Sequence, residues 1–393
     1  MNPTFRHQIV IAAVLLLCGR GLLSDSEAGE PNLSSPDPVA NPLSQLMLDL
    51  PGVTTETGGI DFSKLPILEG EHAVVTRGDD EWQFRLHEYL AWYDGRYWCI
   101  WSHGPVIEDK TTQHVRYSTS LDGVQWAEPQ ILVGPPHEGG YGYIARGLWI
   151  RDGELIALAS LFQEPLFKSG VLHLNAFRWD TSGQRWTPAG RVRDDSMNNF
   201  SPKKLPDGNW MMSRRNAARD VSMMIGGVRA LDDWKVLPLA TYTGTDDQRP
   251  EEPYWYVLPD GMNIVGLFRN NNESKRLLRA FSTDNGRSWS RLVETNFPDA
   301  RSKFNVVHTS RGYYALVSNP NSKARNPLCL SVSRYGLVYT NMAVLPIDSE
   351  PQETLQYPHV IEHDNQLFIT FSRNKRTVEV LKIPLANLDA LIE

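Results

Sequence analysis

One pattern occurs six times in this chain: an apolar run, a short turn, and a second apolar run. The turns are marked by Gly95, Gly153, Gly208, Gly261, Gly312 and Asn365, which are separated by 58, 55, 53, 51 and 53 residues. Asp-Gly between alternating runs favours a β-hairpin, because Gly adopts positive φ without a Cβ clash. Hairpins repeated at a step of about 50 residues are typical of propeller blades. The sequence therefore predicts an all-β fold, a six-bladed β-propeller of four-stranded antiparallel blades.

An irregular β-sandwich is the alternative fold for a chain with this many turns. A sandwich has turn signals every ~8–12 residues but no longer period, so the regular step favours the propeller. We expect one closed domain over residues 61–393. The apolar stretch at residues 60–75 is expected to pair with the last blade, because such closure removes an exposed sheet edge.

The N-terminal residues 1–28 have the pattern of a signal peptide. Arg6 and His7 precede an apolar run at residues 9–17, and small residues around Ala28 suit a cleavage site. The run is too short to span a bilayer as a mature helix. Leu17 is larger than the small residue that usually precedes a lipidated cysteine, so we expect no lipid anchor at Cys18. These features predict export to the periplasm or the extracellular medium.

Residues 29–60 are rich in Pro and Ser near their start and are predicted to form a tether. The net charge of −7 argues against nucleic acid as a partner, because phosphate binding needs a concentrated basic face. Cys99 and Cys329 fall in the first and fifth predicted blades, which do not touch, so we expect free thiols. The sequence has no cluster of metal ligands. We expect no cofactor and a monomer.

A second motif follows some of the hairpins. Residues 282–289, Ser-Thr-Asp-Asn-Gly-Arg-Ser-Trp, match the Asp box Ser-x-Asp-x-Gly-x-Thr-Trp with Ser in place of Thr. Weaker copies lie at residues 120–126, 181–186 and 331–336. The Asp carboxylate can accept hydrogen bonds from its own loop, Gly adopts positive φ, and Trp packs beneath the turn. We expect Trp126 and Trp289 to be buried there, with a structural role.

With these motifs the chain resembles the sialidase (neuraminidase) superfamily, the Asp-box or BNR-repeat propellers, over roughly residues 61–393. In that family a Phe/Tyr-Arg-Ile-Pro motif opens the first blade, and its Arg helps to bind the substrate carboxylate. Residues 84–87, Phe-Arg-Leu-His, are similar, with His87 at the Pro position. The resemblance thus implies Arg85 as one of three carboxylate-binding arginines.

The other implied site residues lie in later blades. Glu252 begins a hairpin at the family's spacing, and Arg269 ends the next strand. Arg325 opens the following Asp-box strand, and Tyr357 begins the last blade where the family has its nucleophile. The resemblance implies Arg269 and Arg325 as the second and third arginines, Tyr357 as nucleophile and Glu252 as its base.

The chemistry of such a site explains these residue types. Converging guanidinium groups suit a carboxylate ligand. Next to that carboxylate a carboxylate nucleophile would be repelled, and sialidases use Tyr instead. Tyr has an ordinary pKa near 10 and needs a base. By the resemblance, the general acid is an Asp in the loop after the second strand. Asp109 stands there, with the neighbouring Glu108 as an alternative.

Three hypotheses on function follow. The first is a secreted sialidase-like exo-glycoside hydrolase acting on acidic, carboxylate-bearing glycans. The second is a lyase or His-dependent glycosidase on uronate-containing polysaccharide, because His87, His103 and His359 lie near the predicted mouth and could transfer protons. The third is a propeller that binds carbohydrate without catalysis. Arginines that bind a carboxylate cannot separate sialic acid from uronic acid.

Overall fold

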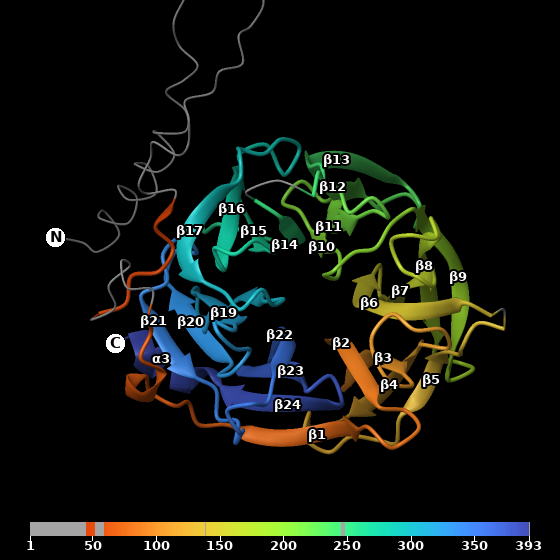
Figure 1. Ribbon diagram of the computed structural model, residues 1–393, viewed down its shortest axis with the longest axis horizontal. Helices are drawn as coiled ribbons and strands as arrows, with labels where there is room; N and C mark the ends of the chain where they lie inside the picture. The colour runs from red at the N-terminus through yellow and green to blue at the C-terminus, as the bar shows by residue number, and fades with distance from the viewer. Residues whose placement is uncertain (1–44, 52–58, 138, 245–247, 393) are drawn as a thin grey trace, which may run out of the picture.

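The computed structural model describes residues 45–51, 59–137, 139–244 and 248–392. These residues form six four-stranded antiparallel sheets arranged as blades around a central axis (Figure 1). The prediction of a six-bladed, all-β propeller is therefore confirmed. The predicted signal peptide at residues 1–28 lies outside the described residues.

The first three blades follow the chain order. Blade 1 contains β2 (Phe84–Tyr93), β3 (Arg96–Gly104), β4 (His114–Ser120) and β5 (Gln130–Val133). Blade 2 contains β6 (Tyr141–Arg151), β7 (Glu154–Gln163), β8 (Leu172–Asp180) and β9 (Arg185–Asp194). Blade 3 contains β10 (Lys203–Lys204), β11 (Trp210–Arg215), β12 (Val221–Gly226) and β13 (Trp234–Ala240).

The last three blades complete the ring. Blade 4 contains β14 (Pro250–Val257), β15 (Ile264–Asn270), β16 (Arg276–Ser282) and β17 (Val293–Pro298). Blade 5 contains β18 (Asn305–His308), β19 (Tyr314–Ser318), β20 (Cys329–Ser333) and β21 (Asn341–Val344). Blade 6 contains β22 (Leu355–His363), β23 (Gln366–Arg373), β24 (Thr377–Pro384) and, as its outermost strand, β1 (Glu71–Arg77).

The ring is closed by strands from both ends of the propeller. β1 pairs antiparallel with β24, so that the chain preceding blade 1 completes blade 6. A short 3₁₀ helix (Phe62–Lys64) precedes β1, and the final helix α3 (Leu385–Ile392) packs beside β20 and β21. In this closure β1 covers the edge of β24 that would otherwise be unpaired, as expected from the sequence.

The hydrophobic core is divided among the six blade interfaces. A separate cluster of buried side chains fills each interface between neighbouring blades, including the one between blades 6 and 1 that contains Val75 and Phe368. Cys99 and Cys329 are buried free thiols in different clusters. Because every blade buries its faces against two neighbours, the ring holds the inner strands in fixed positions around the axis.

Part of the predicted tether belongs to the folded domain. Met47, Leu48 and Leu50 are buried between blades 4 and 5, although the sequence placed them in a tether at residues 29–60. Their backbone groups are also satisfied, because Asn296 accepts from the N–H groups of Met47 and Leu48 at 2.7 and 2.9 Å. Arg279 donates to the Leu46 carbonyl at 3.0 Å. Apolar burial together with these hydrogen bonds anchors the segment.

The Asp boxes form the turns between third and fourth strands. In the copy after β16, Gly286 has a φ of 76°, and Asp284 accepts hydrogen bonds from the backbone and hydroxyl of Ser288 at 2.8 and 2.6 Å. Trp289 donates to the Gly286 carbonyl at 2.9 Å. Trp126 and Trp289 are partly rather than fully buried, because each turn lies at the edge of its blade.

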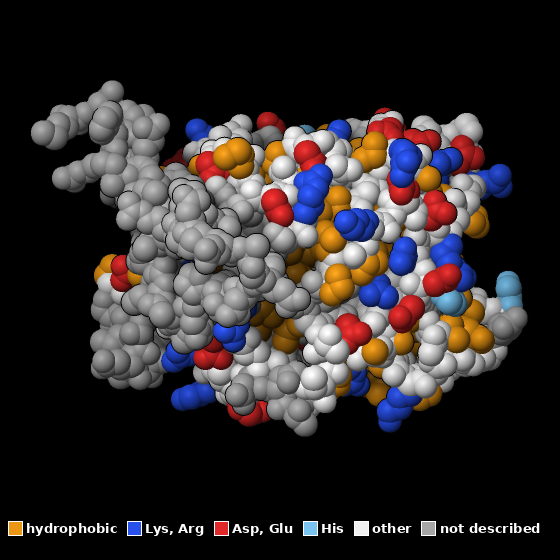
Figure 2. Space-filling model, turned by 90° about the horizontal axis from the view of Figure 1, so that it is seen from above, with side chains coloured by type: hydrophobic (Ala, Val, Ile, Leu, Met, Phe, Trp, Pro, Cys, Tyr) orange, Lys and Arg blue, Asp and Glu red, His pale blue; other side chains and the backbone are white. Residues whose placement is uncertain are grey.

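None of the helices in the described part of the chain has the length and apolar character needed to cross a bilayer. On the side of the molecule shown in Figure 2, acidic and basic side chains are interspersed over the described surface.

Candidate active site

Local irregularities in the first strands bring functional side chains to one end of the axis. The ladders between first and second strands are interrupted by bulges in β2, β6, β14 and β22. His87, Glu252 and Tyr357 are the positive-φ residues of three of these bulges, with φ values of 60°, 51° and 56°. A bulge re-aims the side chain that the regular pleat would direct elsewhere. The same structural position in three blades therefore carries three different polar side chains.

Arg269 connects two of these side chains. Its Nη1 atom donates to Glu252 Oε2 at 3.2 Å and to the Tyr357 hydroxyl at 3.3 Å. All three side chains are largely withdrawn from solvent. The sequence prediction placed Tyr357 and Glu252 within direct hydrogen-bond reach of each other. In the structure both contact the same guanidinium group, which bridges them.

The surroundings of Tyr357 and Glu252 shift their pKa values in opposite directions. Burial and the adjacent Glu252 carboxylate raise the pKa of Tyr357 above its ordinary value, so the phenol is protonated at neutral pH. Burial alone would raise the pKa of Glu252, but the charges of Arg269 and Lys303 outweigh burial and lower it. Glu252 is thus ionised and the Tyr357 phenol neutral, the protonation states from which Tyr can transfer a proton to Glu. The transfer also requires a direct contact between the two oxygens, in place of the Arg269 bridge seen here.

Arg325 also lies near Tyr357. Its guanidinium carbon is 5.8 Å from the centroid of the Tyr357 ring. It is held there by hydrogen bonds to the Gln356 side chain and to the Arg301 carbonyl, the latter at 2.7 Å. The structure therefore brings two of the three predicted arginines, Arg269 and Arg325, to Tyr357.

The third predicted arginine, Arg85, is engaged elsewhere. It is the second residue of β2, at the same end of the propeller, but its guanidinium group donates to the Trp82 carbonyl and, at 3.4 Å, to Thr76 in β1. Its nearest carboxylate is Asp79, at 4.0 Å. The expectation that Arg85 joins the other two arginines is therefore corrected, because β1 and the loop before β2 provide it with partners away from Tyr357.

Two arginines that the sequence analysis missed face the cluster instead. Arg215 ends β11 and donates to Glu251 Oε1 at 2.6 Å, and its positive charge helps to lower the pKa of Glu252. Arg146 is the bulge residue of β6, is buried, and acts through its charge on His87 and Asp109. The sequence held a signal for Arg215, because this residue ends the second strand of its blade and Arg269 is the next-to-last residue of the second strand in the following blade.

The loop between β3 and β4 supplies the two candidate acids. Glu108 accepts from Lys375 Nζ at 2.6 Å and lies 3.2 Å from His87 Nε2. These two partners hold its pKa below the ordinary value against the effect of burial. Asp109 has no such partner for its carboxyl group among the described residues. Burial, and the charge of Glu108 beside it, raise its pKa to about 7.

The three histidines that the sequence analysis considered for proton transfer lie in different surroundings. His87 is buried, its ring centroid lies 5.5 Å from that of Tyr357, and its Nδ1 is 3.1 Å from Ser102 Oγ. Burial lowers its pKa to about 4, so the ring is neutral. His103 stacks on Trp82 at 5.1 Å, and His359 accepts a hydrogen bond from the Leu90 N–H at 3.2 Å. Only His87 of these three has a described contact with Tyr357.

Two buried ionisable side chains, Lys303 and Glu88, lie close enough to interact electrostatically, and Lys303 also interacts in this way with Glu252. Lys303 has no hydrogen-bond partner for Nζ in the described residues, and this atom lies 4.1 Å from the Tyr89 ring centroid. Burial lowers its pKa to about 8. Burial also raises the pKa of Glu88 to about 8, and neither of its carboxyl oxygens has a described partner. No group of three or more His, Cys, Asp or Glu side chains in the described residues is placed to hold a metal ion.

Comparison with solved structures finds several proteins with a similar fold. A protein of unknown function from Dyadobacter fermentans superposes with a TM-score of 0.62 at 14% identity, over 80% of this chain and 98% of that one. The leech intramolecular trans-sialidase, complexed with 2,7-anhydro-Neu5Ac, gives 0.64 at 13% identity, over 81% and 71%. The Penicillium chrysogenum α-L-arabinanase, complexed with arabinobiose, gives 0.60 at 14% identity, over 81% and 99%.

These identities establish a common fold and no more. None of the curated proteins compared with this sequence matches it. The model of the BNR repeat-like domain family, however, matches residues 89–369, which include all of blades 2 to 5, most of blade 1, and the first strand and part of the second strand of blade 6. The chain therefore belongs to the BNR repeat-like domain family and is a sialidase-like β-propeller.

Proposed function

We propose that this protein is a glycoside hydrolase of sialidase type that acts on glycans bearing a carboxylate. The observation that carries the proposal is the contact of Arg269 with both Tyr357 and Glu252 at 3.3 and 3.2 Å. The fold supports a glycosidase, since the structural neighbours include sialidases and an arabinanase. We further propose that the enzyme works outside the cytoplasm, on the basis of the N-terminal sequence pattern at residues 1–28.

In this mechanism the substrate carboxylate binds between Arg269 and Arg325. Arg269 forms charge-assisted hydrogen bonds with the substrate, and Glu252 then becomes available to accept the Tyr357 proton. The phenolate oxygen attacks the anomeric carbon, and the bond from that carbon to the leaving oxygen breaks. Asp109 donates its proton to the leaving oxygen, a role that suits a carboxylic acid with a pKa near the working pH. Water, deprotonated by Asp109 as base, then attacks the anomeric carbon, the bond from that carbon to the Tyr357 oxygen breaks, and Glu252 returns its proton to the phenolate.

The electrostatics favour Asp109 over Glu108 as the acid. Glu108 is paired with Lys375 and His87, which stabilise its ionised form. A carboxylate held in that way does not carry a proton for the leaving group at neutral pH. Glu108 is therefore assigned to positioning His87 and Lys375 at the edge of the site.

The test is an activity screen of purified enzyme on sialosides and on glucuronate-containing glycans, with Tyr357→Phe beside wild type. Release of free sialic acid or uronic acid by wild type, and its loss in Tyr357→Phe, supports the proposal. Tyr93→Phe is the matched control, because its hydroxyl bonds to the Gly153 carbonyl away from the site. Full hydrolytic activity in Tyr357→Phe would exclude Tyr357 as the nucleophile.

A uronate lyase or His-dependent glycosidase is the second candidate, favoured by the contact of His87 with Tyr357. His103 and His359, which the sequence also offered for this role, have no described contact with Tyr357. The same screen separates the candidates. A lyase forms an unsaturated product that absorbs in the near ultraviolet, and a purely binding propeller forms no product.

A further inference from the structure

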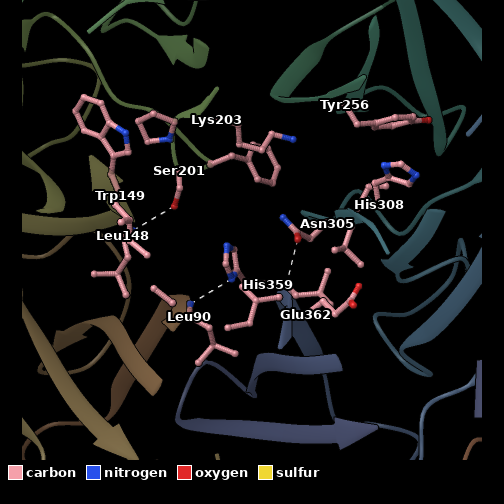
Figure 3. A pocket seen from close by; sticks show the side chains of 18 of the residues that line it. Leu90, Leu148, Trp149, Ser201, Lys203, Tyr256, Asn305, His308, His359 and Glu362 are labelled. Atoms are coloured by element: carbon pink, nitrogen blue, oxygen red, sulfur yellow. Dashed lines mark hydrogen bonds between the residues drawn. The ribbon is translucent and has the colours of Figure 1, made fainter. Parts of the chain in front are cut away.

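A cavity lies on the propeller axis at the end opposite Tyr357. Its volume is about 900 Å³, and the first strands of the blades line it where they approach their hairpin turns. Tyr357 and Glu252 lie near the other ends of the same strands. Figure 3 shows side chains from different blades projecting around this opening. The cavity is therefore a separate space from the candidate active site.

Aromatic side chains form much of the wall. Trp92, Trp149 and Trp210 come from blades 1 to 3, and Trp255 and Tyr256 come from blade 4. Trp92 and Trp210 are only partly buried, so parts of their rings remain accessible. Pockets of a few hundred to about 1,000 Å³ with aromatic walls and a few placed polar groups are the usual form of small-ligand sites.

Two of the polar groups present hydrogen-bond donors. His359 accepts the Leu90 N–H at Nδ1, so the proton of its neutral ring resides on Nε2. Asn305 accepts the Val360 N–H at Oδ1, 3.1 Å away, which leaves its amide NH₂ as the donor. Both hydrogen bonds connect neighbouring blades and fix the side chains that make them (Figure 3). The donors are therefore held in place before any ligand arrives.

The charges in the lining are predominantly basic. Lys203 donates to the Trp255 carbonyl and lies 3.9 Å from the Tyr254 ring centroid, with no carboxylate within ion-pair distance among the described residues. Burial lowers its pKa to about 7. Lys204 is exposed at the rim, and Glu362 is the only acidic residue in the lining. The Glu362 carboxylate already accepts the Ser310 N–H at 2.8 Å. An ammonium that is partly withdrawn from water and has no counter-ion is costly, and an anionic ligand would offset that cost.

We propose that this cavity is a second binding site for a saccharide that carries a carboxylate. The carboxylate binds at Lys203, the ring hydroxyls accept from His359 and Asn305, and the apolar face of the sugar packs on the partly exposed ring of Trp210. The charge of the lining selects an acid, and the donors and aromatic rings together select a sugar over a simple anion. The site does not depend on the chemistry at Tyr357, and a glycan bound there would be held on the face away from catalysis.

The test is isothermal titration with D-glucuronate, N-acetylneuraminate and D-glucose. The titrations use the Tyr357→Phe/Arg269→Gln variant, in which the candidate active site is disabled. We expect either acid to bind. Glucose should bind at least roughly tenfold more weakly, because it has no carboxylate to form the charge-assisted bond. Absence of acid binding in this background would overturn the proposal, as would inorganic phosphate binding as tightly as the sugars. Neither result depends on whether the enzyme hydrolyses any glycan.

Substitutions locate the binding within the cavity. Lys203→Met removes the cation, and Lys235→Met, on the exposed strand β13 of the same blade, is its control. Asn305→Asp is the second test, because it retains the acceptor for Val360 and replaces the NH₂ donor with negative charge. If Asn305→Asp is folded, its affinity for D-glucuronate and N-acetylneuraminate should be lower by at least roughly tenfold. Unchanged affinity in folded Asn305→Asp and in Lys203→Met would overturn the assignment.

Discussion

Tyr357 and Glu252 occupy equivalent positions in blades 6 and 4. Each has positive φ within a first-strand bulge, each is followed by proline, and both side chains contact Arg269. The blade repeat thus forms the same positive-φ bulge in both strands, and the sequence places a phenol in one bulge and a carboxylate in the other. Their shared guanidinium partner is the relationship on which the proposed chemistry depends.

Tyr357→Phe should abolish hydrolysis while the protein remains folded. The substitution removes only the hydroxyl, which accepts from Arg269, and leaves the ring packed beside Phe84 and Leu86. We expect kcat to fall by at least about 10³-fold, the scale seen when a nucleophile is removed. Substrate binding, measured by titration, should change little. A Tyr357→Phe enzyme with kcat within tenfold of wild type would contradict the role of this hydroxyl.

Arg269→Gln should weaken the binding of acidic substrates. Charge-assisted hydrogen bonds contribute about 1.5–3 kcal/mol each, so kcat/KM should fall roughly 10- to 100-fold or more. Glu252 would also lose its closest positive charge, so its pKa should rise and the melting temperature should fall. Arg287→Gln is the control, because Arg287 pairs with Asp207 on the surface at an Asp-box turn. Equal losses in both variants would show that the effect is not specific to the site.

The activity should decline as pH rises through about 7. Asp109, with a pKa raised to about 7 by burial and by Glu108, is protonated below that pH and loses its proton above it. A general acid acts only in its protonated form, so kcat should fall over the same pH range in which Asp109 loses its proton; this fall is the alkaline limb of the pH–rate profile. Asp109→Asn should lower kcat on substrates with poor leaving groups and flatten this limb. A wild-type limb that persists in Asp109→Asn would assign it to another group.

Acid should destabilise the fold through His359. Burial lowers the pKa of this ring to about 3 in the folded protein, against an ordinary value of 6.5. The unfolded chain therefore binds a proton that the folded chain does not, and stability is lost as pH falls below 6.5. His359→Gln keeps an acceptor for the Leu90 N–H and removes the titration.

The free energy of unfolding by urea, measured for wild type and His359→Gln between pH 7.5 and 4.5, checks this expectation. As pH falls over that range, the free energy of unfolding of wild type should decrease by about 2–3 kcal/mol more than that of His359→Gln. Buried acids such as Glu88, with their raised pKa values, contribute equally to both proteins and cancel in the difference. A difference independent of pH would contradict the prediction.

Trp289→Ala should reduce stability without a specific effect on catalysis. The indole packs over Gly266, where an added Cβ would lie 2.8 Å from the ring, and donates to the Gly286 carbonyl. Because the side chain is only partly buried, we expect a loss of about 2–3 kcal/mol, below the full cost of deleting a buried Trp. Thermal unfolding and kcat/KM at a temperature where both proteins are folded provide the measurement. Loss of activity in the folded variant would indicate a role near the site.

The sequence alone determined the architecture, because local rules govern it. Asp-Gly hairpins need only the backbone freedom of Gly95 and its counterparts, and their even spacing requires repeated blades. The Asp boxes are equally local, since Asp284, Gly286 and Trp289 interact within one turn. The end of the propeller at which the candidate site lies was also predictable, because antiparallel pairing places the starts of first strands beside the ends of second strands.

The tertiary structure decided which side chains meet at the axis. Arg85 matches a family motif in sequence, but β1 and the loop before β2 supply its partners, and these lie elsewhere. Arg146 and Arg215 face the cluster because a bulge and a strand end happen to direct them there. Likewise, Met47 belongs to the core because Asn296, 249 residues away, satisfies its N–H. Side-chain direction at a bulge and contacts between distant segments depend on the closed ring, so only the folded chain could settle them.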